Sequence, residues 1–200
     1  MDDHRSASAD HRIRLTGRLV RSAYPLPMGT NTSSVHVMAD MAEIIDTGSK
    51  WARSARIVIN APAGLIFDVV ADPSQHHRFD GSGMVEGSVS GPRRLEGGSR
   101  FGMQMRMKVP YRTSNEVVEF EDGRLIAWCH FNHHRWRYEF EPVDEHTTIV
   151  TETFDGSTAR FPPGLLLINA YAGNQIAVAK TLVRLKSIME APAPAEEHAE

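Results

Sequence analysis

The chain contains a single cysteine, Cys129, so no disulfide bond forms within it. A lone thiol is typical of a reducing compartment, and we expect a cytoplasmic protein. No apolar run is long enough to span a membrane, because the leucine-rich run at residues 165–168 is followed at once by Asn169. The net charge of −3 also lacks the basic excess that nucleic-acid binding requires. We therefore expect no disulfide framework, no membrane span and no nucleic-acid partner.

Motifs for cofactor and metal chemistry are missing as well. Gly81 and Gly83 follow a predicted helical turn and open a strand, whereas a phosphate-binding loop leads from a strand into a helix. No histidine or cysteine spacing matches a zinc motif, and neighbouring histidines on a strand point in opposite directions. The same alternation separates Cys129 from His130, so this pair is not an activated nucleophile. We expect no metal and no cofactor.

Both ends of the chain lack a regular apolar pattern. Residues 1–52 mix Ser, Asp, Thr, Gly and Pro with scattered Arg, and residues 191–200 alternate Pro with Ala before turning acidic. Such segments bury too little apolar surface to offset the entropy of ordering. We therefore predict a disordered N-terminal extension and a disordered tail around a folded unit at 53–190. Met38 and Met41 stand just ahead of that unit, and either is a candidate for the natural start.

Short periodic segments fill the folded unit. A strand at 55–59 leads through a proline turn into a helix at 63–71, and a second short helical turn follows at 74–79. Alternating apolar and polar residues with turn signals between them predict further strands. These strands cover residues 84–90, 100–108, 111–120, 125–131, 135–141 and 147–154. After Pro163 no proline appears before Pro192, which predicts one long helix that ends near Glu190.

The order of these elements defines a fold class. Strands joined by short connections predict an antiparallel sheet, and helices segregated to one side give an α+β architecture. The closing helix is longer than any of the strands, so it must lie across the sheet. Its apolar residues recur at helical spacing, which predicts one buried face. They are Ile168, Ala172, Ile176, Ala179, Leu182, Leu185 and Met189.

Several stretches, taken in order, resemble one family. They are residues 57–73, 117–128, 136–142 and 181–186. Through them the chain resembles the START-like (SRPBCC) superfamily, in its polyketide cyclase/dehydrase branch. The resemblance implies a helix-grip domain, in which a bent seven-stranded antiparallel sheet wraps around a long C-terminal helix and an apolar cavity, with two short helices after the first strand. Many relatives carry an aromatic-rich segment where this chain has residues 75–81, and no catalytic set of the family maps onto it.

In such a fold the inner face of the sheet is also the wall of the cavity. Met103, Met105 and Met107 share one face of their strand, and flexible thioethers suit either an adaptable ligand site or an irregular core. The residues that we predict to bind the ligand are Met103, Met105, Met107, Asn115, Val117, Trp128, Trp136, Tyr138, Phe140, Ala172 and Ile176. Glu152 is in phase with Phe154, but an inward carboxylate is costly, so we expect Glu152 to face solvent.

Histidines are the remaining candidates for chemistry. Five of the ten stand in two groups, which are His76 with His77, and His130 with His133 and His134. Loop histidines usually face solvent, yet one that titrates near neutrality at the mouth of a cavity could act as a general acid or base. The catalytic candidates are His76, His77, His130 and Asp80.

The sequence favours a binding function. The expected role is to hold a small hydrophobic molecule, a lipid or a polyketide-like compound, as a carrier or sequestering protein that is a monomer or a homodimer. The alternative is a cyclase or dehydratase that acts on such a ligand by acid/base chemistry. A protein-interaction module that uses the groove for a partner is a third interpretation.

Overall fold

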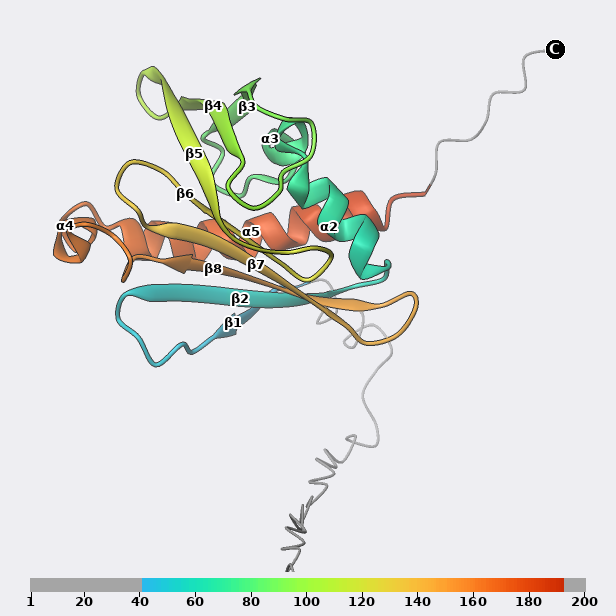
Figure 1. Cartoon of the computed structure of the whole chain (residues 1–200). Helices are drawn as coiled ribbons and strands as arrows, with labels where there is room; N and C mark the ends of the chain where they lie inside the picture. The colour runs from blue at the N-terminus through green and yellow to red at the C-terminus, as the bar shows by residue number, and fades with distance from the viewer. Residues whose placement is uncertain (1–40, 193–200) are drawn as a thin grey trace, which may run out of the picture. The chain divides into compact units, whose positions relative to one another are not determined.

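The computed structural model describes residues 41–192, which form one antiparallel sheet and a set of helices (Figure 1). The strands are β1 (Glu43–Ile45), β2 (Ala52–Ile59), β3 (Val85–Ser90), β4 (Arg100–Arg106), β5 (Pro110–Glu121), β6 (Leu125–Cys129), β7 (Arg135–Pro142) and β8 (Thr148–Asp155). The helical segments are α2 (Ala63–Ala71), the 3-10 turn η1 (Pro73–Gln75), α3 (His76–Phe79), α4 (Pro162–Leu167) and α5 (Ala170–Met189). The expected α+β class is confirmed.

The strands follow the order β1-β2-β8-β7-β6-β5-β4-β3 across the sheet, with neighbouring strands antiparallel. From β3 to β8 each strand pairs with the next one along the chain, as short connections require. The segment between β2 and β3 contains α2, η1 and α3, so three helical segments follow the second strand instead of the two short helices expected after the first. It crosses the inner side of the sheet, where α2 packs on β7 and α3 packs on α5 and β3.

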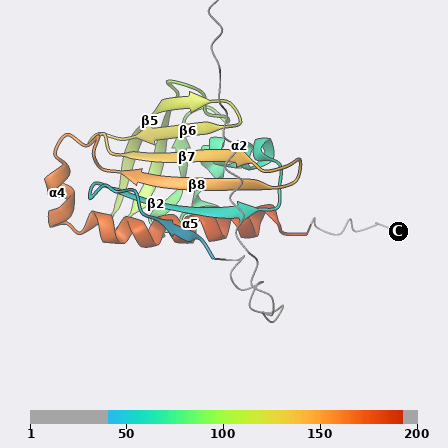
Figure 2. The ribbon, with the colours of Figure 1, turned by 90° about the horizontal axis from the view of Figure 1, so that it is seen from below.

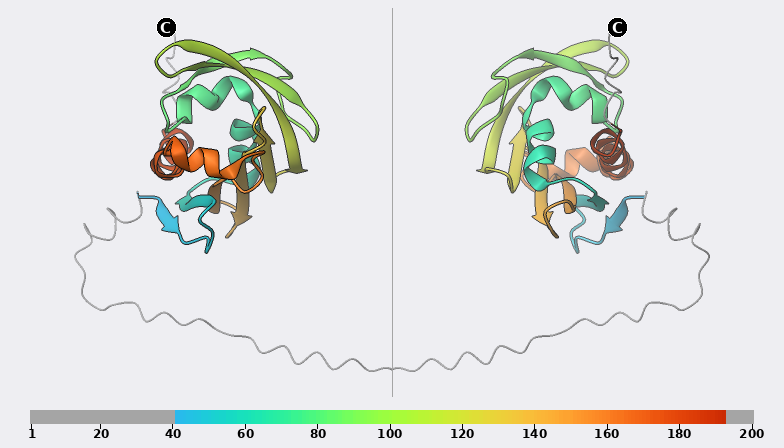
Figure 3. Two further views of the ribbon diagram at one scale, coloured as in Figure 1. Left: turned by 90° about the vertical axis from the view of Figure 1, so that its left-hand side faces the viewer. Right: turned by 90° about the vertical axis from the view of Figure 1, so that its right-hand side faces the viewer.

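The sheet is strongly curved and α5 lies on its concave side (Figures 2 and 3). Irregular register supports this curvature, because β-bulges bend a strand and increase its twist. One shift lies between Val117 and Glu119 in β5, and β3 carries two more, between Val85 and Gly87 and between Ser88 and Ser90. Helix α5 packs mainly on β2 and β8. The arrangement is the helix-grip fold that the family resemblance implies.

The sheet has eight strands in the described part of the chain rather than the expected seven. The additional strand, β1, pairs with β2 through Ile44 opposite Ala55. It spans 3 residues, which is too short to show an alternating pattern in the sequence. Strand β1 lies ahead of residue 53, where the sequence predicts the folded unit to begin. The disorder predicted for residues 1–40 and 193–200, and the proposed start at Met38, lie outside the described residues.

The closing helix is broken, which corrects the prediction of one continuous helix. Helix α4 ends at Leu167, Asn169 adopts a left-handed conformation with φ of 54°, and α5 then begins at Ala170. Asparagine tolerates this conformation better than most residues, so the break needs no glycine or proline to announce it. The predicted buried face is wrong at its beginning, since Ile168, at the break, is 74% exposed and Ile176, inside α5, is 58% exposed.

A closed apolar core fills the end of the domain near α2. Phe67 of α2 is fully buried, and its ring lies 5.4 Å from that of Phe140 and 5.8 Å from that of Phe120. Leu182 and Leu185 of α5 are fully buried in the same cluster, as the sequence predicts. Burial of these side chains is the main stabilising contribution at this end of the sheet.

Candidate functional site

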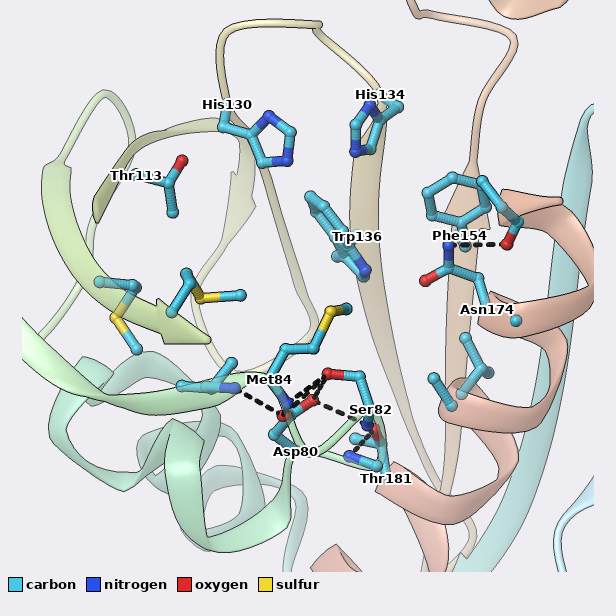
Figure 4. A pocket seen from close by; sticks show the side chains of 18 of the residues that line it. Asp80, Ser82, Met84, Thr113, His130, His134, Trp136, Phe154, Asn174 and Thr181 are labelled. Carbon is cyan, nitrogen blue, oxygen red and sulfur yellow. Dashed lines mark hydrogen bonds between the residues drawn. The ribbon is translucent and has the colours of Figure 1, made fainter. Parts of the chain in front are cut away.

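A cavity of about 960 Å³ lies between the inner face of the sheet and the helices α4 and α5. This volume is at the upper end of the range of small-molecule sites in proteins. The cavity wall comes from β4 to β8, from the turn that follows α3, from the loop between β6 and β7, and from α4 and the first half of α5. Figure 4 shows this pocket from close by.

Aromatic side chains form one wall of the cavity. The ring of Trp128 stacks on that of Tyr138, with centroids 5.3 Å apart, and Trp136 contacts Phe154 edge-on at 5.8 Å. These residues come from neighbouring strands β6, β7 and β8, where the register places Trp128 opposite Trp136 and Trp136 opposite Phe154. The strand period of two therefore assembles the wall from residues that alternate with outward-facing ones. On the outer face, Arg135 and Arg137 pair with Glu119.

Methionines line the opposite part of the cavity. Met103 is buried and Met105 is half-buried on β4, while Met107, just beyond the strand, is 68% exposed at the mouth. Ile176 of α5 borders the cavity from the helix side. Flexible thioethers adapt to different ligand shapes, so this part of the wall can change its contour without moving the sheet.

Asp80 holds a turn at one end of the cavity. Its carboxylate accepts hydrogen bonds from the backbone amides of Ser82 at 3.0 Å, Met84 at 2.8 Å and Val85 at 2.9 Å (Figure 4). The next residue, Gly81, donates to the Thr181 hydroxyl at 2.9 Å, and a Cβ atom on Gly81 would lie 2.1 Å from a carbonyl oxygen of α5. Asp80 therefore ties the turn together, and its oxygens are occupied by the backbone.

His76 is also fixed by the fold. Its Nε2 atom lies 2.8 Å from the carbonyl oxygen of Val70, and its ring stacks on Trp128 at 4.9 Å. Burial lowers its pKa to about 4, so the ring is neutral at pH 7. His77, one residue along the helix, is exposed and does not border the cavity.

Two further histidines meet at the other end of the cavity. The ring centroids of His130 and His134 are 4.3 Å apart, and both side chains lie on the same side of the pocket (Figure 4). Burial lowers the pKa of His130 to about 4, and burial together with His130 lowers that of His134 to about 3. The Nδ1 atom of His130 is buried without a hydrogen-bond partner. His134 was not among the sequence candidates, because His133, with φ of 64°, changes the chain direction just before it.

Glu152 faces the cavity, which corrects the prediction that it faces solvent. The residue is 3% exposed, and the register places it opposite Tyr138 on the inner face. Burial raises the pKa of Glu152 to about 8, although a hydrogen bond with Tyr138 acts in the opposite direction. Its Oε2 atom has no partner. In the alternation of β8, Glu152 lies on the same face as Val150 and Phe154, which correctly predicts an inward side chain. The prediction of a solvent-facing side chain gave more weight to the cost of burying a carboxylate.

The predicted ligand-binding residues divide into two groups. Those that border the cavity are Met103, Met105, Met107, Asn115, Trp128, Trp136, Tyr138 and Ile176. Val117 and Phe140 are buried in the hydrophobic core but do not border the cavity. Ala172 is exposed and does not border the cavity, because within the continuous helix α5 it lies about 100° around the axis from the buried Tyr171. Among the catalytic candidates, His76, His130 and Asp80 border the cavity.

No metal cluster accompanies these groups in the part of the chain that the structure describes. Within residues 41–192, no three histidine, cysteine or carboxylate side chains converge in the way that a metal ion needs. The helices in the same range are all too short or too polar to cross a membrane.

Comparison with known proteins places the chain in a family. Residues 50–190 match the family described as polyketide cyclase / dehydrase and lipid transport, and the chain belongs to this family. The protein Rv0088 of Mycobacterium tuberculosis H37Rv, which is described as uncharacterised, is 38% identical over 128 residues. That alignment covers 62% of this chain and 56% of the relative, so the chain spans little more than half of the relative's length.

Solved structures share the fold at low sequence identity. A protein from Rhodobacter sphaeroides superposes with a TM-score of 0.56 at 12% identity, over 76% of this chain and 99% of the other. Protein Ms6760 from Mycobacterium smegmatis gives a TM-score of 0.53 at 17% identity, over 74% of this chain and 99% of the other. These likenesses support the architecture described above.

Proposed function

We propose that this protein binds a small hydrophobic ligand, a lipid or a polyketide-like compound, in its internal cavity and acts as a carrier or sequestering protein. The observation that carries the proposal is the cavity of about 960 Å³, walled by aromatic and methionine side chains. Apolar surface of this kind, enclosed between a sheet and a helix, gains free energy when a ligand displaces water from it. Membership of a family whose description includes lipid transport supports the same proposal.

The exposed apolar residues at the mouth of the cavity support the proposal that the ligand enters from solvent. Phe161, Ile168 and Ile176 border the cavity and are 61%, 74% and 58% exposed. An apolar rim continuous with an apolar interior gives a hydrophobic molecule a path that remains favourable along its length. The break at Asn169 separates the short helix α4 from α5 at this rim.

Titration of the neutral fluorescent probe Nile red tests the proposal. The protein is expected to bind the probe at a stoichiometry near one and to raise its emission. Met105→Trp fills part of the cavity and is expected to reduce the binding at least tenfold. Val143→Trp, a change at a residue that is 57% exposed and outside the cavity, is expected to leave it unchanged. Absence of binding, or equal binding by the two variants, would contradict the proposal.

A second proposed function is an acid/base reaction on the bound molecule, of the cyclase or dehydratase kind. The observation that favours it is the presence of a buried acid, Glu152, and a neutral histidine, His130, in one cavity. A protonated carboxyl can donate a proton and a neutral imidazole can accept one. Loss of turnover in both Glu152→Gln and His130→Phe, with Nile red binding retained, would support an enzyme. Unchanged turnover would refute it.

Location and assembly remain predictions from the sequence. The single thiol, Cys129, is buried and supports the expected cytoplasmic location. Size-exclusion chromatography with light scattering would test the expectation of a monomer or a homodimer, and a larger assembly would contradict it.

A further inference from the structure

The apolar cavity contains polar atoms that lack partners. Three buried side-chain atoms in the described residues make no hydrogen bond, which are Thr113 Oγ1, His130 Nδ1 and Glu152 Oε2. All three residues border the cavity. A buried polar atom without a partner destabilises the folded protein, and native proteins seldom leave several in one cavity without a reason. A ligand that supplies the missing partners would recover that free energy.

These atoms occupy two separate positions. Thr113 and His130 lie on the same side of the pocket, near His134 (Figure 4). Glu152 lies opposite Tyr138, which is four residues beyond His134 along the chain that enters β7. At about 3.3 Å per residue, that spacing corresponds to roughly 13 Å along an extended strand. The aromatic wall of Trp128 and Trp136 lies between the two positions. The cavity thus has a polar point at each end of an apolar middle.

The polar groups of the interior are not paired with opposite charges. Neither Glu152 nor the two histidines take part in a salt bridge with another described residue. Around Glu152, β7 contributes Tyr138, β2 contributes Ala55, and Asp80 adds a negative charge that opposes ionisation. Lys180 is the cationic side chain among the residues that border the cavity, and it is exposed at the helix surface.

A charged ligand group would therefore enter without a counterion. Burial of an unpaired carboxylate or ammonium costs far more than burial of a neutral polar group. The lowered pKa of both histidines and the raised pKa of Glu152 are consistent with an interior that is uncharged near neutral pH. A pure hydrocarbon would avoid that cost but would leave the three polar atoms unpaired.

We propose that the cavity recognises an uncharged, oxygen-bearing molecule, with one carbonyl or hydroxyl oxygen beside Glu152 and Tyr138 and a second beside Thr113 and His130. This inference rests on the proposed binding function and narrows it. It excludes free fatty acids that place the carboxylate in the interior, away from Lys180 at the surface, and it favours a rigid, ring-containing compound over an unfunctionalised alkyl chain.

Four biphenyl probes of matched shape test the inference. 4,4'-Diacetylbiphenyl carries a neutral carbonyl at each end, and 4,4'-diisopropylbiphenyl replaces each oxygen with a methyl group. Biphenyl-4,4'-dicarboxylate and 4,4'-bis(aminomethyl)biphenyl carry negative and positive charges at the same places. Affinities are measured by quenching of tryptophan fluorescence, since Trp128 and Trp136 border the cavity. Because the diisopropyl compound is more hydrophobic, the quantity compared is the ratio of the diacetyl to the diisopropyl affinity in each variant.

Replacement of the polar side chains should change this ratio. Glu152→Leu and Thr113→Val are each expected to lower the ratio about tenfold. Each variant removes one hydrogen bond to a ligand oxygen, worth about 1 kcal/mol, and leaves that oxygen buried without a partner, which lowers the affinity further. Glu152→Gln keeps a donor and should hold the ratio within about threefold of wild type. We expect the wild type to lose diacetyl affinity as the pH rises through about 8, and Glu152→Gln should remove that loss. Thermal unfolding of each variant checks that the fold is intact.

The outcomes separate the inference from the function on which it rests. Binding of none of the four probes, nor of Nile red, would refute the binding function and the inference with it. If the diisopropyl compound binds and no variant changes the ratio of diacetyl to diisopropyl affinity, the inference is refuted while the binding function stands. Tightest binding by the diammonium probe, lost in Glu152→Gln, would show that Glu152 is a cation site and would overturn the proposal. Tightest binding by the dicarboxylate would overturn it as well.

Discussion

The two ends of the inner sheet face are made by the same strands, yet one end is closed and the other is open. On β7 and β8, Phe140 and Val150 lie in the packed cluster under α2. Two to four residues along the same strands, Trp136 and Glu152 border the cavity. Helix α5 shows the same division, since Leu182 and Leu185 are fully buried while Ile176 is 58% exposed at the cavity. We refer to these regions as the core end and the cavity end.

The difference lies in what covers the sheet. At the core end α2 supplies Phe67, whose ring fills the space above Phe140. At the cavity end His76 of α3 covers Trp128, but the space beside Trp136 and Glu152 stays open as the cavity. The polar Glu152, His130 and Thr113 point into the space. The comparison shows that an inward direction does not by itself distinguish a core residue from a binding residue.

The largest expected effect comes from opening the core end. Phe67→Ala should lower the free energy of unfolding by about 3–5 kcal/mol, because it leaves a cavity beside the rings of Phe120 and Phe140. Phe131→Ala removes a ring of the same size that borders the cavity and is 74% exposed, and it should change stability by less than about 0.5 kcal/mol. Urea unfolding followed by circular dichroism measures both. Similar losses of unfolding free energy in the two variants would contradict the distinction between a packed core end and an open cavity end.

The pH dependence of stability is expected to report on the cavity end. Burial depresses the pKa of His76, His130 and His134 below the ordinary value of 6.5, so between about pH 4 and 6.5 the unfolded chain binds more protons and these histidines make stability rise with pH. Glu152 acts in the opposite direction. Its pKa is raised from 4.5 to about 8, so in that window the native state holds a proton that the unfolded chain has released, and stability falls as pH rises.

Above pH 6.5 only the Glu152 contribution remains among these four groups. Since one pKa unit corresponds to about 1.4 kcal/mol, the free energy of unfolding should fall by up to about 2 kcal/mol between pH 6.5 and 8. Glu152→Gln carries no titratable group and should remove the decline. Melting temperatures at half-unit pH intervals would show it. A wild-type protein as stable at pH 8 as at pH 6.5 would contradict the assignment of Glu152 as a buried neutral acid.

The smallest expected changes in stability come from a Thr→Val substitution made once at each end. The Thr148 hydroxyl, at the core end, donates to the carbonyl oxygen of Ala61 at 2.8 Å. Thr148→Val should lower the free energy of unfolding by about 1 kcal/mol because that oxygen loses its partner. Thr113→Val removes a hydroxyl that has no partner, and it should raise stability by about 1 kcal/mol in the absence of ligand. Destabilisation by Thr113→Val would indicate a structural hydrogen bond for this hydroxyl.

Much of the fold could be predicted from local patterns. The alternation in strands such as Arg135–Pro142 places Tyr138 and Phe140 inside and Glu139 outside, and the structure agrees. Helix α2 has the predicted bounds of 63–71, since a proline turn before it and Asp72-Pro73 after it fix both ends. Strand β1 was missed because a strand of 3 residues has no period to detect. The break at Asn169 was missed because asparagine enters a left-handed conformation without a sequence signal as strong as glycine.

The candidate site was predicted less completely. Trp128, Trp136, Tyr138 and Met103 border the cavity as expected from their strand faces. Glu152 was assigned to solvent because an isolated buried carboxylate is costly, although its phase pointed inward. That cost is reduced when the group stays protonated beside Tyr138, and only the packing of β7 on β8 reveals this neighbour. His134 is brought to His130 by the turn at His133, which no periodicity predicts.

The sequence by itself determined the fold class, the family and the alternation of strands such as β7, because strand periods are local properties and short connections permit few topologies. Only the tertiary structure decided which inward residues lie under α2 and which border the cavity. That decision depends on where α2, α4 and α5 pass over the curved sheet, and their paths are set by contacts between residues far apart in the chain. For the same reason, the unpaired atoms of Thr113, His130 and Glu152 become visible as one set only in three dimensions.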